Sequence, residues 1–430
     1  MADASDLTFR RTSCQPGAGE DRLIGEPGRV GGKDPGLVLV VVFAGGVATG
    51  QRRFPSARTQ SGLGGSGSIL VEEDAMRSGR GFGVGLGLRL HGWEISPVSL
   101  DLTRNPAPTA PIARLVERLT ASGGGRIGMR GLLGDSVGLR RRARRTWAPG
   151  LAVRRCWMWD RHDRRDPTWF PQGVAHSWQT GYAEDVLLVS WYSKAGQGSR
   201  ISVVDLGTGR YQHVGLVEVH AGSDGESVTT PMAVHAGGIV WHGRWLHVAA
   251  TRRGFLTFDV DDLLYDPTGE SGFDYLLPLR LAHQSSGDAD GMRFSFLSLD
   301  RSASETAIVV GEYARASDSA RLARYAVTPT GELAADAAGA IQAEVVGDGV
   351  HQMQGAVAVN GIYYLTVSHG ALAPGEVVVG SPGRWRRRRF RTPPGPEDLA
   401  FHPPTDRFWS VTEHPGRRWL FSMPRSALRP

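Results

Sequence analysis

Cysteine, lysine and long apolar runs are scarce in this sequence of 430 residues. Cys14 and Cys156 are the only cysteines, so at most one disulfide can form and neither a disulfide framework nor a cysteine-based metal site can be built. Lys33 and Lys194 are the only lysines among 49 basic residues. No apolar run approaches the roughly 18–20 residues of a membrane-spanning helix, so we expect no transmembrane span.

The common catalytic and nucleotide-binding motifs are also missing. The chain has no G-x-S-x-G nucleophile motif, no H-E-x-x-H zinc motif and no P-loop. The glycines of segment 79–90 depart from the dinucleotide-binding pattern, and we interpret this segment as low complexity. We interpret DRHDRRD (160–166) as a solvated charge cluster that precedes the folded repeats.

Charge and composition divide the chain into two parts. Residues 1–155 hold 23 basic and 13 acidic residues, whereas the remainder holds 26 basic and 30 acidic residues. Gly, Arg, Pro and Ser dominate the first part, which shows no sustained periodicity. We expect residues 1–155 to be a basic, low-complexity and largely disordered region, with a short helix over 111–120 and a basic linker over 139–156. Residues 156–430 are the predicted folded domain.

Segment 35–48 has the order of a secretory signal. An apolar core from Leu37 to Ala44 follows Arg29 and Lys33 and precedes small residues. The segment begins more than thirty residues into the chain, so either the natural start lies later or the segment is one buried strand. We expect a secreted or extracytoplasmic protein.

A three-strand motif recurs five times after residue 165. Its first strands are FPQGVAHS (170–177), VHAGGIVW (234–241), MRFSFLSLD (292–300), QMQGAVAV (352–359) and GPEDLAFH (395–402). The corresponding positions Gly173, Gly238, Phe296, Gly355 and Asp398 are 65, 58, 59 and 43 residues apart. Blades of roughly 40–50 residues with variable loops fit this period.

We therefore predict an all-β fold, a β-propeller of five blades. A sixth blade is possible if the C-terminal strand or residues 155–170 complete it. The competing interpretation is a β-sandwich or two packed β domains. Neither would explain why the residues that begin the first strand and those that end the second strand recur together in each motif. Stacking the blades buries both faces of each sheet and leaves only short edges.

In a propeller the first strand of each blade lines the central channel, so polar residues at equivalent positions converge. The candidate ligand-binding residues are Gln172, His235, Gln354 and Tyr192. The candidate catalytic residues are Glu312, Glu397, Asp398, Glu413, His369 and His414. The alternative is that these side chains hydrogen-bond neighbouring blades. We expect inter-blade packing for Trp191, Trp241, Trp245 and Trp409.

The arginine run Arg386–Arg389 lies between the fourth and fifth motifs. Nucleic-acid binding would need several converging basic elements with stacking aromatic residues, and only Trp385 and Phe390 flank the run. We therefore interpret it as a solvated outer strand or loop, and we consider a nucleic-acid partner unlikely.

The stretches WFPQGVA, LLVSWYS, RISVVDLGTGRYQHVGLVEV, HAGGIVWHGRWLHVA, GPEDLAF and WSVTEHPGRR resemble a group of uncharacterised secreted proteins of high-GC actinobacteria, over about residues 156–425. More loosely, the chain is similar to gluconolactonase-like and streptogramin-lyase-like propellers. That likeness implies a divalent metal, Ca²⁺ or Mg²⁺, held by carboxylates and Asn. This sequence has no Asn where the first strands begin, and Asn360 lies in a turn.

Two functions are consistent with these features. The first is an extracytoplasmic propeller that binds a small molecule, carbohydrate or protein at the mouth of its channel. The second is a hydrolase or lyase in the channel that acts on a glycoside or lactone through carboxylates and histidine.

Overall fold

The fold is described from a computed structural model, which describes residues 100–429 except 135–138, 179, 183–184, 286–291, 302–304 and 316–319. Segments 35–48 and 79–90 lie outside the described residues, so the signal sequence and export stay predictions. Within the described ranges, no helix is long and apolar enough to cross a membrane.

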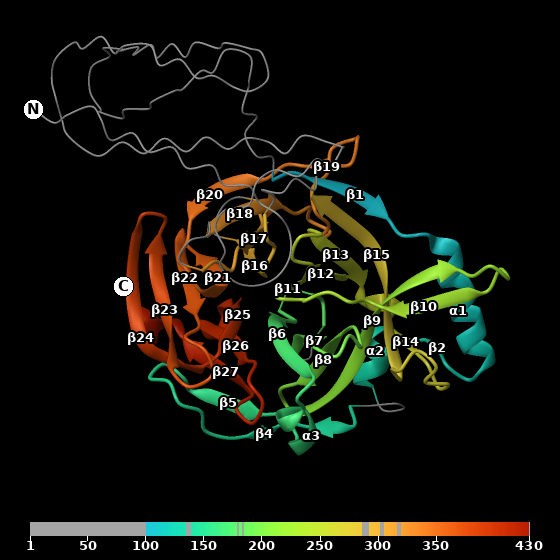
Figure 1. Cartoon of the computed structure of the whole chain (residues 1–430), viewed down its shortest axis with the longest axis horizontal. Coiled ribbons are helices and arrows are strands. Elements are labelled where there is room, and N and C mark those ends of the chain that lie inside the picture. The colour runs from blue at the N-terminus through green and yellow to red at the C-terminus, as the bar shows by residue number, and fades with distance from the viewer. Residues whose placement is uncertain are drawn as a thin grey trace, which may run out of the picture. The chain divides into compact units, whose positions relative to one another are not determined.

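The strands form five blades around an axis, which confirms the predicted β-propeller (Figure 1). Each sequence motif supplies the three inner strands of one blade. Blade 1 consists of β6 (Trp169–His176), β7 (Val186–Ser193), β8 (Ser199–Asp205) and β9 (Arg210–Ala221). Blade 2 consists of β11 (Ile239–His242), β12 (Trp245–Ala249), β13 (Phe255–Asp259) and β15 (Tyr275–Ser285). Blade 3 consists of β16 (Phe296–Asp300), β17 (Ala307–Gly311), β18 (Arg321–Ala326) and β20 (Glu344–Asp348).

The last two blades complete the ring. Blade 4 consists of β21 (Met353–Val359), β22 (Ile362–Val367), β23 (Pro374–Ser381) and β24 (Arg384–Pro394). Blade 5 consists of β25 (Pro396–His402), β26 (Arg407–Thr412), β27 (Trp419–Pro424) and β5 (Arg155–Met158). Strand β5 precedes all other blade strands in the sequence and pairs antiparallel with β27. Residues 155–158 therefore complete blade 5 rather than a sixth blade, and they tie the two ends of the domain together.

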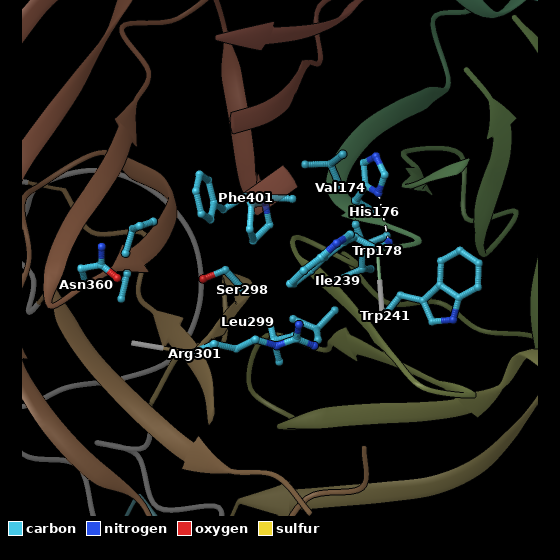
Figure 2. A pocket seen from close by; sticks show the side chains of 16 residues that line it. Val174, His176, Trp178, Ile239, Trp241, Ser298, Leu299, Arg301, Asn360 and Phe401 are labelled. Carbon is cyan, nitrogen blue, oxygen red and sulfur yellow. Dashed lines mark hydrogen bonds between the residues drawn. The ribbon is translucent and has the colours of Figure 1, made fainter. Parts of the chain in front are cut away.

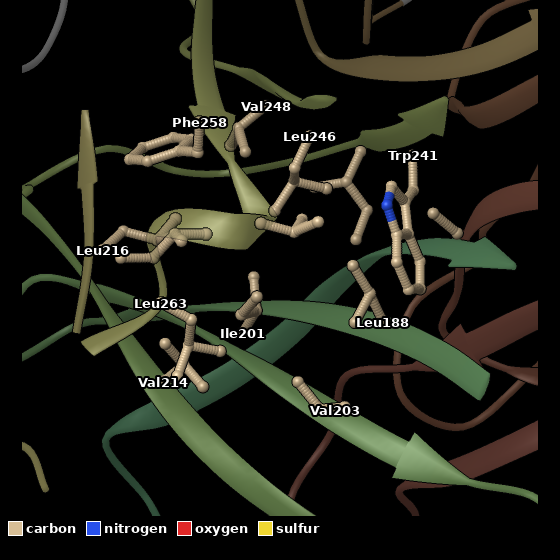
Figure 3. Close-up of a cluster of buried hydrophobic side chains, with 14 of the residues drawn as sticks. Leu188, Ile201, Val203, Val214, Leu216, Trp241, Leu246, Val248, Phe258 and Leu263 are labelled. Carbon is tan, nitrogen blue, oxygen red and sulfur yellow. The ribbon is translucent and has the colours of Figure 1, made fainter. Parts of the chain in front are cut away.

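Hydrophobic clusters lie between neighbouring blades. Figure 3 shows the cluster between blades 1 and 2, which includes Leu188 and Leu246. Along β7, Leu188 enters this cluster, whereas Leu187 and Val189 enter the cluster shared with blade 5. This alternation is the two-residue period of a strand buried on both faces. Each fully buried Leu contributes roughly 1.5–3 kcal/mol, so the blades hold one another in place.

Three of the four highlighted tryptophans pack between blades as predicted. Trp241 belongs to the cluster between blades 1 and 2, and Trp191 and Trp409 belong to the cluster between blades 5 and 1. Trp245 differs, because it is only half-buried and the guanidinium of Arg244 lies 5.8 Å from its ring. Its place at the start of β12, next to a turn, explains the difference.

The innermost strands touch one another near the middle of the channel. A Cβ atom on Gly173 would lie 2.8 Å from the backbone nitrogen of Ile239, and one on Gly238 would lie 2.1 Å from that of Leu297. A Cβ atom on Gly355 would lie 2.6 Å from the nitrogen of Leu399. Glycine recurs at this level because neighbouring backbones are in contact. We call this level the waist, and the two ends of the channel the N-side mouth, where the innermost strands begin, and the C-side mouth, where they end.

Residues 100–134 and 139–154 pack on the outer edges of the ring. Strand β1 (Leu102–Pro106) pairs with β15, and α1 (Thr109–Ala121) is the helix predicted over 111–120. The apolar face of α1 packs against β9 and β15. The other elements outside the blade strands are β2 (Gly125–Arg126), α2 (Gly128–Leu133), β3 (Arg141–Arg142), β4 (Arg144–Arg145), α3 (Arg161–Arg165), β10 (Ser227–Pro231), η1 (Val260–Asp262), β14 (Leu264–Tyr265), β19 (Ala340–Ile341), η2 (Pro403–Thr405) and η3 (Arg425–Leu428).

The segment that we interpreted as a basic linker, 139–156, is structured instead. Strand β3 pairs with β9, and β4 pairs with β5 at the edge of blade 5. Ala143, Ala148 and Ala152 are buried. Backbone pairing and these small apolar residues order the segment although most of its side chains are arginines. The run Arg386–Arg389 lies in β24, the outermost strand of blade 4, as the interpretation of an outer strand predicted.

Candidate functional site

At the N-side mouth, side chains from three blades meet. The amide of Gln172 in blade 1 donates to Glu413 in blade 5 at 3.3 Å. The amide of Gln354 in blade 4 donates to Glu397 in blade 5 at 3.4 Å. The carboxylates of Glu413 and Asp398 lie near enough to Glu397 to act on its charge. The structure therefore brings five of the candidate residues together.

Glu397 is buried, with 2 % of its surface exposed. Burial, followed by the negative charges of Glu413 and Asp398, raises the pKa of Glu397 well above its usual range. A buried carboxyl group whose pKa is raised, beside the partly exposed carboxyl group of Glu413, is an arrangement that can transfer a proton.

Asp398 spans the waist. Its Oδ2 accepts hydrogen bonds from the backbone N–H of Val174 at 3.2 Å and of Ile239 at 3.3 Å, in blades 1 and 2. Burial raises the pKa of Asp398 well above its usual range, although these N–H groups oppose the shift. These contacts join three innermost strands, which is the structural role that the alternative interpretation assigns to such residues.

Tyr192, His235 and His414 lie around the same mouth. The rings of Tyr192 and His235 stack with their centres 4.2 Å apart. Burial, followed by negative charge on Glu413 and Glu397, raises the pKa of Tyr192 to about 12, so its hydroxyl lies close enough to sense both carboxyl groups. His414 Nε2 lies 3.6 Å from Glu413 Oε1.

The remaining two candidates, Glu312 and His369, have other partners. Glu312 forms a two-pronged ion pair with Arg321, at 2.7 and 2.8 Å, and accepts the backbone N–H of Arg293. His369 Nε2 lies 3.5 Å from Glu376, which also binds Arg387. Their contacts hold neighbouring strands together and do not connect them to Glu397.

The acidic residues of the N-side mouth do not fit a metal site. Among the residues that the structure describes, no group of three or more His, Cys, Asp or Glu side chains is arranged to hold a metal ion. One oxygen of Asp398 accepts hydrogen bonds from two backbone N–H groups. The positive ends of these N–H dipoles point at the oxygen and would repel a cation bound there. Asn360 lies at the opposite end of the channel.

A serine–histidine–aspartate series occurs in blade 1, and its serine is inaccessible. Ser202 Oγ lies 2.9 Å from His213 Nδ1, and His213 Nε2 lies 2.9 Å from Asp163 Oδ2. Ser202 and Asp163 are fully buried, and Trp191 Nε1 donates to Ser202 Oγ at 2.8 Å. We therefore assign the series a structural role that links three strands to the 160–166 segment.

Asp163 corrects our interpretation of DRHDRRD as a solvated cluster. Its carboxylate accepts hydrogen bonds from Tyr211 at 2.6 Å and Arg200 at 3.1 Å, besides His213. These partners lower the pKa of Asp163 despite its burial, which acts in the opposite direction. Helix α3 turns this carboxylate inward, whereas a charged heptapeptide in sequence gives no sign of which member is buried.

A cavity of about 300 Å³ occupies the C-side mouth. All five innermost strands or the residues directly after them line it, as Figure 2 shows. Its walls include Trp178, Leu299, Val359 and Phe401, and its polar groups include Arg301 and Asn360. The volume lies at the lower end of the range for small-molecule sites, and mainly apolar walls with a few polar groups are typical of them.

Arg301 is the unusual group in this cavity. Its Nη2 donates to His242 Nδ1 at 3.1 Å, and its guanidinium lies 4.9 Å from the centre of the Trp178 ring. Its Nη1 is buried and has no hydrogen-bond partner in the described part of the chain. Burial alone lowers the pKa of Arg301, and no described carboxylate opposes this shift. A guanidinium without a counter-ion in a partly apolar cavity is costly unless a ligand supplies the anion.

His176, the last residue of β6 in blade 1, also lines this cavity. Its ring stacks on that of His402 with centres 4.0 Å apart, and its Nε2 lies 2.7 Å from Asp185 Oδ1. The backbone N–H of Trp178 donates to His176 Nδ1 at 3.1 Å. These contacts fix the turn that carries Trp178 over the cavity.

Sequence reasoning missed the C-side mouth because it considered only where the first strands begin. The residues that matter here follow the ends of the same strands: Trp178, Arg301 and Asn360 come one or two residues after β6, β16 and β21. The same repeat register could have identified them.

No protein-family model and no curated protein matches the chain. Solved propellers are similar in structure. A gluconolactonase of Xanthomonas campestris is 13 % identical with a TM-score of 0.32, over 66 % of this chain and 95 % of that one. A β-propeller domain of Myceliophteria thermophila is 12 % identical with a TM-score of 0.31, over 64 % of this chain and 99 % of that one.

Proposed function

We propose that the protein binds a small organic anion in the cavity of the C-side mouth. Arg301 holds the anionic group of the ligand, and the rings of Trp178 and Phe401 contact its apolar or planar body. The unpaired, buried Nη1 atom of Arg301 is the observation that carries this proposal.

The charge balance of the cavity favours an anion over a neutral ligand. His242 accepts from Arg301 through Nδ1, so this nitrogen carries no proton. Burial, followed by the positive charge of Arg301, lowers the pKa of His242, so it stays neutral and leaves the guanidinium charge uncompensated. A ligand carboxylate would gain a charge-assisted hydrogen bond with Nη1, the stronger kind of hydrogen bond.

The walls restrict the rest of the ligand. A cavity of about 300 Å³ admits a compact molecule of one or two rings and not a polymer. Trp178 lines the cavity beside the guanidinium of Arg301, so its ring can contact a planar group of a ligand whose anion binds Arg301.

The test is a fluorescence titration of the full chain with benzoate, phenylacetate and indole-3-acetate, each beside its neutral amide. We expect the carboxylates to bind at least about tenfold more tightly than the amides, because a charged hydrogen bond contributes about 1.5–3 kcal/mol. Arg301→Leu should abolish this preference and leave the unliganded protein at least as stable as the wild type, because an unpaired charge is removed. Arg252→Leu, an exposed arginine of blade 2, is the control. Equal affinity for carboxylates and amides would contradict the proposal.

A second candidate function is acid–base chemistry at the N-side mouth. The raised pKa of Glu397 beside Glu413 favours it, since two neighbouring carboxyl groups, one with a raised pKa, are the arrangement used for acid–base catalysis. Hydrolysis of a glycoside or lactone that is lost in Glu397→Gln, with the fold retained, would support this function.

A further inference from the structure

The outer edges of blades 4 and 5, together with β3 at the outer edge of blade 1, carry one basic surface, which we call the basic edge and define as residues 140–155 and 384–391. The first segment holds seven arginines and the second holds six, and neither holds an Asp or Glu. The backbone N–H of Leu151 donates to the carbonyl of Phe390 at 2.8 Å, and that of Ala152 donates to Arg391 at 3.2 Å. The two segments therefore form a continuous surface.

Most arginines of the basic edge have no acidic partner. Ion pairs within the described residues engage Arg140, Arg141 and Arg387 only. The exposed arginines without an ion pair are Arg142, Arg144, Arg145, Arg154, Arg155, Arg384, Arg386 and Arg389. Burial and repulsion from Arg155 and Arg154 lower the pKa of the neighbouring Arg407. A surface on which positive charges repel one another attracts a polyvalent anion, which relieves that repulsion.

Large apolar side chains stand out from the same surface. Trp147 is 79 % exposed, Leu151 is 61 % exposed and Phe390 is 57 % exposed. Phe390 also has a φ of +60°, a backbone conformation that a bulky residue rarely adopts. Glycine would adopt this conformation with less strain. The Phe390 ring is mostly exposed, so packing within the fold does not explain why a large aromatic residue stands here.

We propose that the basic edge is a docking surface for an anionic lipid membrane. Exposed Trp, Phe and Leu beside a cluster of arginines match a bilayer interface, where apolar side chains enter the headgroup region and cations meet lipid phosphates. A single-stranded nucleic acid would use the arginines and the rings but gains nothing by stacking on Leu151. This binding does not depend on the cavity of the C-side mouth.

The experiment is co-sedimentation of the full chain with vesicles of phosphatidylcholine, with and without about 30 mol% phosphatidylserine, near 0.15 M salt. We expect binding to the anionic vesicles only, and weaker binding as salt increases. In Arg144→Ser/Arg386→Ser/Arg389→Ser, the partition coefficient should fall about fivefold per arginine. In Trp147→Ser/Leu151→Ser/Phe390→Gly it should fall at least about tenfold.

The matched control is Val345→Ser/Arg252→Ser, which removes an exposed apolar residue of blade 3 and an exposed arginine of blade 2. It should bind as the wild type does, and circular dichroism verifies that each variant is folded. The proposal is overturned if the folded wild type ignores anionic vesicles, if both basic-edge variants bind them normally, or if a single-stranded oligonucleotide binds while the vesicles do not.

Discussion

The carboxylate of Asp398 in blade 5 accepts the backbone N–H of Val174 in blade 1 at 3.2 Å, and the same oxygen accepts the N–H of Ile239 in blade 2. One side chain thus satisfies two backbone donors on strands whose inner edges have no neighbouring strand. The contact fixes the ring at its waist, and it satisfies one of the two oxygens of this fully buried carboxyl group.

Substitutions at Asp398 separate its hydrogen bonds from its charge. Asp398→Asn keeps an oxygen for both N–H groups, so the free energy of unfolding at pH 7 should stay within about 1 kcal/mol of the wild type. Asp398→Ala leaves two buried donors unpaired and should lose about 2–5 kcal/mol. Urea unfolding followed by tryptophan fluorescence measures both. Equal losses in the two variants would mean that the ionised carboxylate is required.

Glycine at the waist is predicted to be irreplaceable. In Gly238→Ala the new Cβ would lie 2.1 Å from the backbone nitrogen of Leu297, and backbone atoms cannot move aside as a side chain can. We expect a loss of at least about 3 kcal/mol in the free energy of unfolding, or no folded protein. Gly207→Ala is the control, because its nearest neighbour at 3.1 Å is a side-chain atom of Asp205. A stable Gly238→Ala protein would refute the close contact.

Mild acid should destabilise the fold through its buried histidines. Burial lowers the pKa of His213 and of His247 to about 4 and that of His283 to about 3. Unfolded histidines titrate near pH 6.5, so between pH 6.5 and 4 the unfolded state binds more protons and stability falls as the pH falls. Each fully buried histidine should remove about 1–2 kcal/mol by pH 5.

Glu397 and Asp398 act in the opposite direction. Because their pKa values are raised, the folded state keeps protons that the unfolded state releases above pH 4. Their contribution to the free energy of unfolding therefore falls as the pH rises. Urea unfolding between pH 4 and 8 should show the acid loss in the wild type. In Glu397→Gln/Asp398→Asn, the rise of stability with pH should become steeper. A profile that stays flat from pH 7 to 5 in this double variant, where the two opposing carboxyl groups are gone, would contradict buried neutral histidines.

The Ser202 series is predicted to be structural. Ser202→Ala leaves Trp191 Nε1 and His213 Nδ1 without their shared partner and should cost about 1–3 kcal/mol. A serine-directed fluorophosphonate should not label the folded wild type, because Ser202 is fully buried. Mass-spectrometric detection of a label on Ser202 would show that the series is accessible and reactive.

The sequence was sufficient for the fold because the propeller is a local repeat. Each motif carries the strand alternation and glycine spacing of one blade, and Gly173, Gly238 and Gly355 occupy equivalent positions at the waist. The origin of the fourth strand of blade 5 was not predicted, since β5 (Arg155–Met158) pairs with β27 across most of the chain. Short strands paired over such separations leave no periodic signal.

The candidate site was only partly accessible to the same reasoning. Repeat register identified Gln172, Gln354 and Glu397 as residues that meet at one mouth, and their hydrogen bonds with neighbouring blades agree with that expectation. It could not tell that Glu312 is held by Arg321, because an ion pair between adjacent strands looks like two isolated charges in sequence. It also missed Arg301, whose importance lies in a buried Nη1 atom that has no hydrogen-bond partner among the described residues.

A crystal structure of the full chain with the tightest-binding aromatic carboxylate tests the central claim most directly. The account predicts the carboxylate within about 2.7–3.2 Å of Arg301 Nη1, with the ring of the ligand between Trp178 and Phe401. A ligand found at the N-side mouth beside Glu413, or a cavity in which Arg301 turns to a protein carboxylate instead, would contradict it.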